Sequence, residues 1–511
     1  MISCLVTTLL NALGVVAALL AVVYAYFKWT YQYWKSKNVP HVEPTIPFGN
    51  TGNPFTQPRG QNIANMYHMA KEKGWKYCGL YTLLSPIFLV VDIDLVKTIL
   101  TKDFQYFTDR GQYTNEKDDP VGCHLFALGG SKWRNMRTKL TPTFTSGKLK
   151  AMFQTLVDCG LVLEEYIEEN IKPEESVDIK EVLACFSTDV IGSCAFGLDC
   201  NSFKEPNSAF RRYGNTIFTI DKLVALKVLF CGTFPTLARM LGVRQVSRDT
   251  ADFFTKVVED TVSYREKNNV VRKDFLQLLM DIRNTKDGQE NGNGAGDGNS
   301  LTLNEMVAQS FVFFVAGFET SSTTMTFALF ELATNPDMQE RLRDEINEVL
   351  ARHEGKVTYD SLSEMKYLGQ VIDETLRVHS PARLLRRVCN TDYKVPGEDL
   401  VIEKGTSVIV SVRGIHYDEE FWENPKEFDP ERFSEEKKKN MNQYTHLPFG
   451  QGPRMCIGER FGVMQTKVGL TCLLRKFRVK LDKKTKLPLK MSSRTLVNSA
   501  EGGIWLNLEK I

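Results

Sequence analysis

The sequence has no surplus of charge of either sign. Lysine and arginine together number 64, aspartate and glutamate together number 62, and the net charge is +2. Proteins that bind nucleic acid usually carry a basic surplus that pairs with the phosphates. The balance therefore argues against nucleic acid as a partner.

Paired disulfide and metal-binding motifs are also absent. The 11 cysteines are odd in number and scattered, no two of them are spaced as Cys-x-x-Cys, and no histidine spacing suggests a zinc site. A disulfide framework or a structural zinc site needs such clusters. We therefore expect a reducing compartment, and only Cys456 stands in a ligand context.

The sequence lacks a fingerprint for a nicotinamide or flavin cofactor. The glycines of segment 291–299 superficially resemble one, but no apolar strand precedes them and their spacing does not match. The segment is too polar and glycine-rich to pack, so we expect a surface loop there. Redox chemistry on this chain would need electrons from another protein.

Length and periodicity favour one large helical domain. With 511 residues, 42% of them hydrophobic, the chain can bury a large core. The apolar spacing is mostly helical, with short strand-like runs at 87–91 and 408–412 and no internal repeat. The expected fold class is mainly α with small β-sheets, an α+β arrangement.

The amino-terminal stretch predicts a membrane anchor. Residues 2–27 contain no charged side chain, and about 20 apolar residues cross a bilayer. A cleaved signal peptide is the alternative, but the apolar run is long and a charged segment before it is missing. Lys28, Lys35 and Lys37 follow the run, so the positive-inside rule keeps the rest of the chain in the cytosol.

These features divide the chain into three parts. We expect a transmembrane anchor at 1–28, a basic, proline-rich linker at 29–60 and a catalytic domain at 61–511. Closely spaced prolines stiffen an extended linker, which would hold the domain at a defined height over the membrane. A simple linker remains the alternative. The prolines are Pro40, Pro44, Pro47, Pro54 and Pro58.

The segment 449–458, Phe-Gly-Gln-Gly-Pro-Arg-Met-Cys-Ile-Gly, has the composition of a socket for a haem thiolate. Gly450 and Gly452 let the backbone fold tightly under a flat macrocycle. Backbone N–H groups at the start of the following helix lower the thiol pKa of Cys456. Arg454 can pair with a haem propionate. A buried structural cysteine is the alternative for a lone cysteine, but here the whole pattern is present.

A second informative segment is a long apolar helix. Thr302 and Glu305 form a capping box, and Pro336 starts the next helix after the apolar run ends near Leu332. Within its apolar stretch 306–330 the run contains a single acid, Glu319, and an unpaired carboxylate is costly in such surroundings.

Small and polar residues share one face of that helix at spacings of three and four: Phe313, Ala316, Gly317 and Thr320. The small residues leave room for a ligand. Thr320 can donate to a carbonyl one turn earlier, which loosens the helical ladder and admits water. A core helix with a satisfied threonine is the alternative.

The chain from about Pro40 to the carboxyl terminus resembles the cytochrome P450 superfamily, and most closely its microsomal, insect detoxification-type members. The resemblance rests on segment 449–458, on Leu-Thr-Pro-Thr-Phe-Thr-Ser-Gly at 140–147 and on Phe-Val-Ala-Gly-Phe-Glu-Thr at 314–320. It implies the cytochrome P450 fold, preceded here by one transmembrane helix, and haem b ligated by Cys456. The implied activity is that of a haem-thiolate monooxygenase.

The resemblance also implies roles for the two motifs. Ala-Gly-x-Glu-Thr is the family's oxygen-activation motif, so Thr320 would hold dioxygen and its proton-delivering water while Glu319 feeds protons inward. The thiolate of Cys456 would supply electron density that favours O–O cleavage. Other haem contacts are implied for Trp133, Arg137, Arg387, Phe449, Arg454 and Gly458, with Arg386 as the alternative to Arg387.

A structural network is implied by Glu-x-x-Arg at 374–377 and by Pro-Glu-Arg-Phe at 430–433. These motifs resemble the family's buried Glu-Arg-Arg network, so Glu374, Arg377 and Arg432 are assigned to folding and haem retention. The sequence departs from the family where His379 and Ser380 precede Pro381 in place of an aromatic residue and proline. The departure leaves the shape of the substrate pocket open.

Substrate contacts implied by the resemblance are mostly apolar, which favours a lipophilic, weakly oriented ligand. The candidate residues are Phe126, Phe218, Phe313, Ala316 and Leu384. Plain core packing is the alternative for such aromatic residues.

Electrons would come from NADPH through NADPH-cytochrome P450 reductase, with cytochrome b5 as a further partner. Basic residues suited to an acidic flavoprotein flank Trp133 and recur later, although a solvated face is the default for such charges. They are Lys132, Arg134, Lys139, Lys148, Lys150 and Lys437, Lys438, Lys439.

The sequence thus predicts an endoplasmic reticulum monooxygenase with its catalytic domain on the cytosolic side. Lipophilic xenobiotics such as insecticides or plant toxins are the expected substrates. Hydroxylation of an endogenous hormone or lipid is the alternative. A haem-thiolate isomerase or lyase, or a haem sensor, would need no acid-threonine pair, so Glu319 and Thr320 argue against both.

Overall fold

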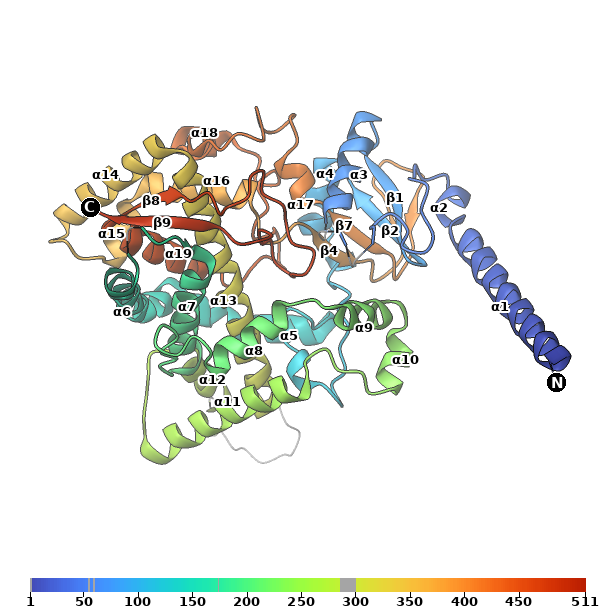
Figure 1. Cartoon of the computed structure of the whole chain (residues 1–511), viewed down its shortest axis with the longest axis horizontal. Helices are drawn as coiled ribbons and strands as arrows, with labels where there is room; N and C mark the ends of the chain where they lie inside the picture. The colour runs from blue at the N-terminus through green and yellow to red at the C-terminus, as the bar shows by residue number, and fades with distance from the viewer. Residues whose placement is uncertain (1, 54–55, 58–59, 173, 285–299) are drawn as a thin grey trace.

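The computed structural model describes residues 2–53, 56–57, 60–172, 174–284 and 300–511. The glycine-rich segment 291–299, for which we expect a surface loop, lies outside the described residues. The described chain is mainly helical with small sheets, which confirms the expected fold class. Figure 1 shows a helix-rich body, a sheet-rich part beside it and α1 projecting away from that part.

The helices vary from single turns to the long central α13. The first group is α1 (Ile2–Thr30), α2 (Tyr33–Ser36), α3 (Gln61–Glu72), α4 (Ile93–Lys97), α5 (Gly130–Leu140), α6 (Ser146–Asn170), α7 (Ile179–Ile191), α8 (Ala209–Phe218), α9 (Lys222–Thr233), α10 (Pro235–Met240), α11 (Arg248–Asn268) and α12 (Phe275–Asn284). The second group is α13 (Leu303–Thr334), α14 (Pro336–Arg352), α15 (Tyr359–Glu364), α16 (Lys366–Val378), α17 (Val412–His416), α18 (Glu435–Asn440) and α19 (Glu459–Leu474).

The strands form small sheets. One has the order β1-β2-β7-β4, another β3-β9-β8, and β5 pairs with β6. Both predicted strands are present, in β2 and β7, although Val412 already begins α17. The strands are β1 (Tyr77–Thr82), β2 (Ser85–Val90), β3 (Val177–Asp178), β4 (Leu385–Val388), β5 (Tyr393–Lys394), β6 (Val401–Ile402), β7 (Ser407–Val410), β8 (Phe477–Leu481) and β9 (Trp505–Lys510).

The central helix α13 begins and ends where the sequence predicts. The Thr302 hydroxyl accepts from the backbone N–H of Glu305 at 3.2 Å, and the Glu305 carboxylate accepts from the Thr302 N–H at 2.8 Å. Asn335 is the carboxyl-terminal cap, and Pro336 is the first residue of α14. The helix is buried over most of its length, so it crosses the centre of the body (Figure 1).

Two hydrophobic clusters make up most of the core. The larger one joins the helices of the body, including α6, α7, α13 and α19. The second lies around the sheet of β1, β2, β7 and β4. The segment that contains Cys456 connects the two, because it follows Leu447 of the second cluster and precedes Phe461 of the first.

Helix α1 is exposed and apolar. A helical span at Cys4–Ser36 has a mean hydropathy of 2.3, and within the described ranges it is the one helix long and apolar enough to cross a membrane. The following residues differ from a free linker. The Trp34 indole N–H donates to the Leu80 carbonyl at 2.9 Å, and Tyr31, Trp34 and Val39 belong to the second core cluster. Aromatic burial against the β1–β2 hairpin therefore attaches this segment to the domain ahead of residue 61.

Candidate active site

Cys456 lies in a tight loop immediately before α19. Its backbone N–H donates to the Phe449 carbonyl at 2.9 Å, and the Met455 N–H donates to the Gly452 carbonyl at 2.9 Å. Gly452 has a φ of +77°, and a β-carbon there would lie 2.0 Å from the Leu100 carbonyl oxygen. Gly452 is therefore needed because the backbone of Leu100 lies against it. The sequence alone had suggested a macrocycle as the reason for the glycine.

The thiol of Cys456 faces the interior of the fold. The residue is exposed, yet burial by the surrounding protein raises the pKa of the thiol. The Gly458 N–H, Arg110 and Arg137 lower that pKa, as expected for a helix start, but burial outweighs them. An accessible side chain that is nevertheless desolvated lines an internal space, since a surface thiol would be hydrated.

Arg454 anchors the loop from within. Its guanidinium donates to three backbone carbonyls, those of Thr108 at 2.7 Å, Leu125 at 3.3 Å and Leu128 at 2.6 Å. It also lies 4.0 Å from the ring centroid of Trp133. Arg454 is fully buried, and desolvation lowers its pKa to about 9. These bonds fix the loop to the segment before α5.

Two further predicted arginines face the same place. Arg137 on α5 donates to the Met455 carbonyl at 3.0 Å. Arg387 on β4 is buried, and desolvation together with the neighbouring Arg110 lowers its pKa to about 9. Arg386 instead donates to the Ser407 hydroxyl at 3.0 Å, so Arg387 is the one that joins the cluster. Opposite side-chain directions of adjacent residues in a strand explain the choice.

Arg110 belongs to this cluster, and sequence reasoning missed it. It donates to the Arg454 carbonyl at 2.8 Å, and desolvation lowers its pKa to about 10. It stands outside every motif, so only its position in the fold identifies it. Arg110, Arg137, Arg387 and Arg454 therefore form a compact group of cations, named here the arginine cluster.

The residues present fit a haem. Four desolvated guanidinium groups repel one another unless anions lie among them. Asp109, 3.9 Å from Arg454, supplies one carboxylate, and two propionates would supply the rest. The Nε of Arg387 has no hydrogen-bond partner among the described residues. Cys456 would bind the iron through its thiolate, while Arg110, Arg137 and Arg387 would hold the propionates. Three more predicted haem contacts border this space. Trp133 lies under Arg454, Phe449 accepts the backbone hydrogen bond of Cys456, and Gly458 caps the start of α19.

The other motif lies on α13, next to the start of α19. The rings of Phe313 and Phe461 have centroids 5.3 Å apart. Ala316 is exposed although most of α13 is buried, so this position also lines an internal space. The Thr320 hydroxyl donates to the Ala316 carbonyl at 2.5 Å, which is the bond the sequence predicts. A hydroxyl is thus held at the surface of this space.

Gly317 serves a different purpose from the predicted one. A β-carbon there would lie 2.3 Å from the Cδ1 atom of Ile191 on α7. The glycine permits close packing of α13 against α7, and it is Ala316 that leaves room for a ligand.

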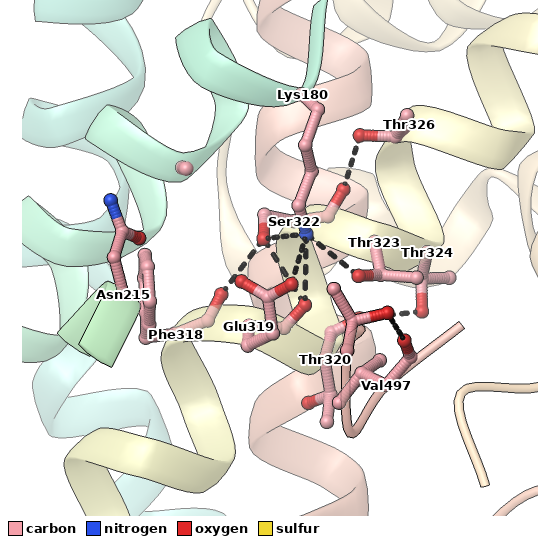
Figure 2. Close-up of polar contacts among 12 residues, drawn as sticks. Lys180, Asn215, Phe318, Glu319, Thr320, Ser322, Thr323, Thr324, Thr326 and Val497 are labelled. Carbon is pink, nitrogen blue, oxygen red and sulfur yellow. Dashed lines mark hydrogen bonds and ion pairs between the residues drawn. The ribbon is translucent and has the colours of Figure 1, made fainter. Parts of the chain in front are cut away.

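Glu319 is buried and ion-paired. The Lys180 ammonium at the beginning of α7 lies 3.0 Å from its Oε1 atom. Figure 2 shows Lys180 pointing into a polar group on α13, where it also donates to the hydroxyls of Ser322 at 2.9 Å and Thr323 at 2.7 Å. The sequence left Glu319 without a partner, because Lys180 is 139 residues away along the chain.

The predicted structural network forms on the side of the fold where the Cys456 loop lies. Glu374 and Arg377 on α16 are fully buried, and the Arg432 Nε atom lies 3.4 Å from Glu374 Oε1. Arg377 donates to the His416 carbonyl at 2.8 Å, and the Leu447 N–H donates to His416 Nε2 at 2.8 Å. The network is thereby connected to the chain that enters the Cys456 loop.

The departure at His379 has a structural counterpart. The His379 ring stacks on Phe327 with centroids 4.3 Å apart and an interplanar angle of 5°. Its Nε2 atom lies 2.6 Å from Glu331 Oε1. Both partners are on α13, so His379 connects the end of α16 to that helix.

Three predicted substrate residues reach accessible space. Phe126 is 48% exposed and lies under the Arg110 guanidinium at 4.1 Å. Ala316 is exposed within α13. Leu384 lines a cavity of about 240 Å³ formed by segments 381–384 and 492–498.

The other two are packed in the core. Phe313 stacks on Phe275 with ring centroids 4.5 Å apart. Phe218 is buried, and its ring centroid lies 6.1 Å from that of Phe318. These rings have protein partners, and the sequence could not separate this packing from a substrate contact. Ring residues on a helix show the same spacing in both cases.

Comparison of the sequence with known proteins identifies a family. The sequence profile of the family described as cytochrome P450 matches residues 40–506. The chain is 42% identical to the probable cytochrome P450 6a14 of Drosophila melanogaster, over 98% of this chain and 100% of that protein. It is 43% identical to cytochrome P450 6a2 of D. melanogaster, covering 98% and 99% of the two chains, and 43% identical to cytochrome P450 6A1 of Musca domestica, covering 98% of each.

Proposed function

The chain belongs to the cytochrome P450 family of haem-dependent monooxygenases, and from that premise we propose that it inserts one oxygen atom from dioxygen into lipophilic small molecules. The proposed substrates are xenobiotics such as insecticides or plant toxins. NADPH supplies the electrons through a partner reductase. Bound haem with a thiolate ligand supplies the activation of dioxygen.

The observation that carries this proposal is the interior position of Cys456 beside the arginine cluster. An accessible but desolvated sulfur and the guanidinium groups of Arg110, Arg137 and Arg387 would suit the two ends of a haem, the iron and the propionates. The Cys456 loop is held by Arg137 and Arg454 through backbone carbonyls, so the ligand stays in place without the cofactor's help.

The residues on α13 support oxygen activation over isomerisation. Thr320 presents a hydroxyl beside the exposed Ala316, where it can hold dioxygen and a water molecule. Glu319 adds a carboxylate one residue away that can move a proton toward that hydroxyl. An isomerase or lyase needs neither group.

Apolar surface supports a substrate that is lipophilic and loosely held. Phe126, Ala316 and Leu384 present carbon atoms to accessible space. Pockets of this kind bind by burial of apolar area, with few polar groups to fix orientation.

Membrane attachment is proposed at two places, with the catalytic domain on the cytosolic face of the endoplasmic reticulum. Helix α1 is the anchor. Helices α9 and α10, at the same end of the molecule as α1 (Figure 1), expose further apolar side chains that suit a lipid surface. Leu223 and Leu226 lie on α9, Leu237 and Met240 lie on α10, and Phe234 and Leu241 cap the ends of these two helices.

Exposed cations near the Cys456 loop support docking of an acidic flavoprotein. Arg460 at the start of α19 donates to the Ser146 hydroxyl at 3.1 Å, which places it at the beginning of α6, the helix that carries the exposed Lys148. Arg134 is also exposed. Lys132 and Lys438 are paired with Glu116 and Asp373. The proposed partners are NADPH-cytochrome P450 reductase and cytochrome b5, which such a basic face would attract.

The test is a reconstitution of the full-length holoenzyme with a microsomal reductase, NADPH and a panel of lipophilic insecticides and plant toxins under ¹⁸O₂. We expect products that carry one ¹⁸O atom and depend on NADPH. Omission of the reductase is the control. Products without the label would contradict monooxygenation, and labelled products only from hormones or lipids would replace the proposed substrate class by the endogenous one.

A further inference from the structure

The cavity of about 240 Å³ beside Leu384, named here the loop cavity, has walls from two distant parts of the chain. One wall is the segment 381–384, between α16 and β4, and the other is the loop 492–498, which precedes β9. Much of the lining is apolar, from Pro381, Ala382, Leu384, Leu496 and Val497. Such a lining suits the apolar part of a ligand.

The loop cavity adjoins the candidate active site on both of its walls. Val497 packs against the hydrophobic cluster that contains Phe318 of α13, and Phe318 lies two residues before Thr320. On the other wall, Leu385 follows the lining segment, and its side chain would lie 3.6 Å from a β-carbon at Gly450, in the predicted haem segment. A ligand in the cavity would therefore lie next to α13 and to that segment.

One charged side chain faces the loop cavity. Among the described residues that line it, Arg383 alone carries a charge, and the other polar ones are Ser492, Thr495 and Asn498. Desolvation and the neighbouring cation Arg413 lower the pKa of Arg383 to about 10. The guanidinium is therefore partly removed from water and still charged at neutral pH.

Asn498 fixes the direction of the Arg383 guanidinium. Asn498 is buried, and its Oδ1 atom accepts a hydrogen bond from Arg383 Nη2. The Arg413 N–H donates to the Arg383 carbonyl at 3.1 Å, which holds the backbone of the same residue. A guanidinium has five N–H donors in a planar fork, so it can hold an amide oxygen and a carboxylate at the same time.

The charges around the loop cavity favour an anion. Arg413 is a second cation near Arg383, and Arg494 is an exposed cation on the loop 492–498. A concave site with cations around it attracts anions from solvent. A carboxylate that reaches Arg383 would form charge-assisted hydrogen bonds, which are stronger where water is partly excluded.

We propose that the loop cavity recognises substrates that carry a carboxylate on an apolar body, and that Arg383 is the residue that selects them. This inference rests on the proposed function and narrows its lipophilic substrates to lipophilic acids. The carboxylate would bind the guanidinium, and the apolar body would lie along Leu384 and Val497 beside α13.

A purely structural contact is the competing interpretation, because the bond between Arg383 and Asn498 joins the two walls of the loop cavity. Loss of a structural contact would weaken the binding of every ligand that occupies the cavity. Loss of an anion site would weaken only the ligands that carry a carboxylate. The comparison of an acid with its uncharged ester therefore separates the two interpretations.

The experiment measures the binding of dodecanoic acid and methyl dodecanoate to the full-length holoenzyme at neutral pH, from the change in the haem spectrum. We expect the wild type to bind the acid more tightly than the ester. In Arg383→Met the Kd of the acid should rise about tenfold or more, because hydrogen bonds to a charged group are lost. The Kd of the ester should stay nearly unchanged. Arg383→Lys should keep part of the preference, since it retains the charge without the planar fork.

Two further variants sharpen the test. Arg494→Met is the matched control, because Arg494 is an exposed cation on the same loop and is not among the described residues that line the cavity. It should leave both Kd values unchanged. Asn498→Asp keeps an oxygen beside Arg383 and adds a carboxylate that competes with the ligand, so it should raise the Kd of the acid alone. This variant also replaces Arg383→Met if that chain does not take up haem.

Three results would overturn the proposal: a wild type that binds the acid no more tightly than the ester, an equal loss of both ligands in Arg383→Met, or an equal effect of Arg494→Met. The binding measurement needs neither NADPH nor reductase. A chain that binds the acid through Arg383 but forms no labelled product would contradict the proposed function alone. Labelled products from a chain with equal affinity for acid and ester would contradict only the role of Arg383.

Discussion

Glu374 and Arg377 form two parallel hydrogen bonds, each 2.7 Å long, with both side chains fully buried in α16. The remaining guanidinium donors reach the carbonyls of His416, Pro425 and Glu427. The pair thus acts less as an isolated ion pair than as a clamp on the chain that leads to the Cys456 loop. Removal of either partner would leave a buried charge uncompensated.

The first prediction follows from this burial. Glu374→Ala should destabilise the fold by about 3–5 kcal/mol, because Arg377 would remain buried without its carboxylate. The measurement is haem content together with the thermal unfolding midpoint. Glu348→Ala is the matched control, since Glu348 forms an exposed i,i+4 pair with Arg352 and should cost only about 0.5 kcal/mol. Equal effects of the two substitutions would contradict the prediction.

The docked segment after α1 yields a prediction about truncation. Deletion of residues 1–27 should release much of the protein from membranes and preserve the haem spectrum, with residual attachment through the apolar residues of α9 and α10. Deletion of residues 1–40 should lower stability further, because it also removes the buried side chains of Tyr31 and Trp34. Loss of a buried tryptophan costs about 3–5 kcal/mol.

Membrane fractionation and the thermal midpoint distinguish the two truncations. Met240→Ser in the shorter deletion should reduce the residual attachment. Equal stability of both truncated proteins would show that the segment is a free linker, and failure of the 1–27 deletion to take up haem would move the domain boundary toward the amino terminus.

The ligand prediction concerns Cys456→Ser. A neutral hydroxyl is a poor iron donor, so this variant should bind little haem or lose the red-shifted Soret band of the reduced carbon monoxide complex. Cys123→Ser is the control, because that half-buried cysteine lies in the loop before α5 and its Sγ contacts the Asp119 carbonyl, a contact that serine can keep. A normal spectrum from Cys456→Ser would reject Cys456 as the ligand.

Local signals in the sequence predicted the parts of the fold that depend on neighbouring residues. The capping box at Thr302 and the proline at 336 mark the ends of α13, because hydrogen bonds within four residues determine helix ends. The Cys456 loop was equally readable, since its glycines, arginine and cysteine all lie within ten residues.

Contacts between distant segments could not be predicted. Lys180 meets Glu319, Arg110 joins the arginine cluster, and Trp34 packs on the β1–β2 hairpin, yet Lys180, Arg110 and Trp34 stand in no recognisable motif. Such pairs depend on how helices and strands pack against one another, and the spacing of apolar residues along the sequence does not specify this packing. Phe313 shows the opposite case. The face that it shares with Ala316 suggested a substrate contact, but in the structure its ring packs on Phe275.

A pH prediction follows from a buried histidine near the Cys456 loop. Burial lowers the pKa of His446 to about 3, whereas an unfolded histidine titrates near pH 6.5. The unfolded state therefore binds the proton more tightly, and stability is lost as the pH falls from about 6.5 toward the folded pKa. The loss amounts to at most about 1.4 kcal/mol per pH unit for one group.

His446→Phe tests this, since phenylalanine can keep the ring contact with Phe433 at 4.7 Å. The variant loses the contact with the Asp373 carbonyl, so its midpoint at about pH 7 should be lower. Its further drop between about pH 7 and about pH 5.5 should be smaller than that of the wild type. Parallel curves would show that His446 does not contribute to the acid sensitivity.

Thr320→Ala separates oxygen activation from the other haem-thiolate activities. One helical hydroxyl contributes little to stability, so its removal should leave folding and haem uptake nearly unchanged. The hydroxyl that donates to the Ala316 carbonyl would be lost from the surface beside Ala316, and proton delivery to dioxygen should suffer. NADPH consumption should continue while more of its electrons end in hydrogen peroxide, and an organic peroxide supplied in place of dioxygen should recover part of the product.

The control is Thr334→Ala on the same helix, whose hydroxyl also bonds to backbone carbonyls but lies near the end of α13. Coupling efficiency unchanged from this control would remove Thr320 from the mechanism and favour an isomerase, because only oxygen activation requires a hydroxyl at this position.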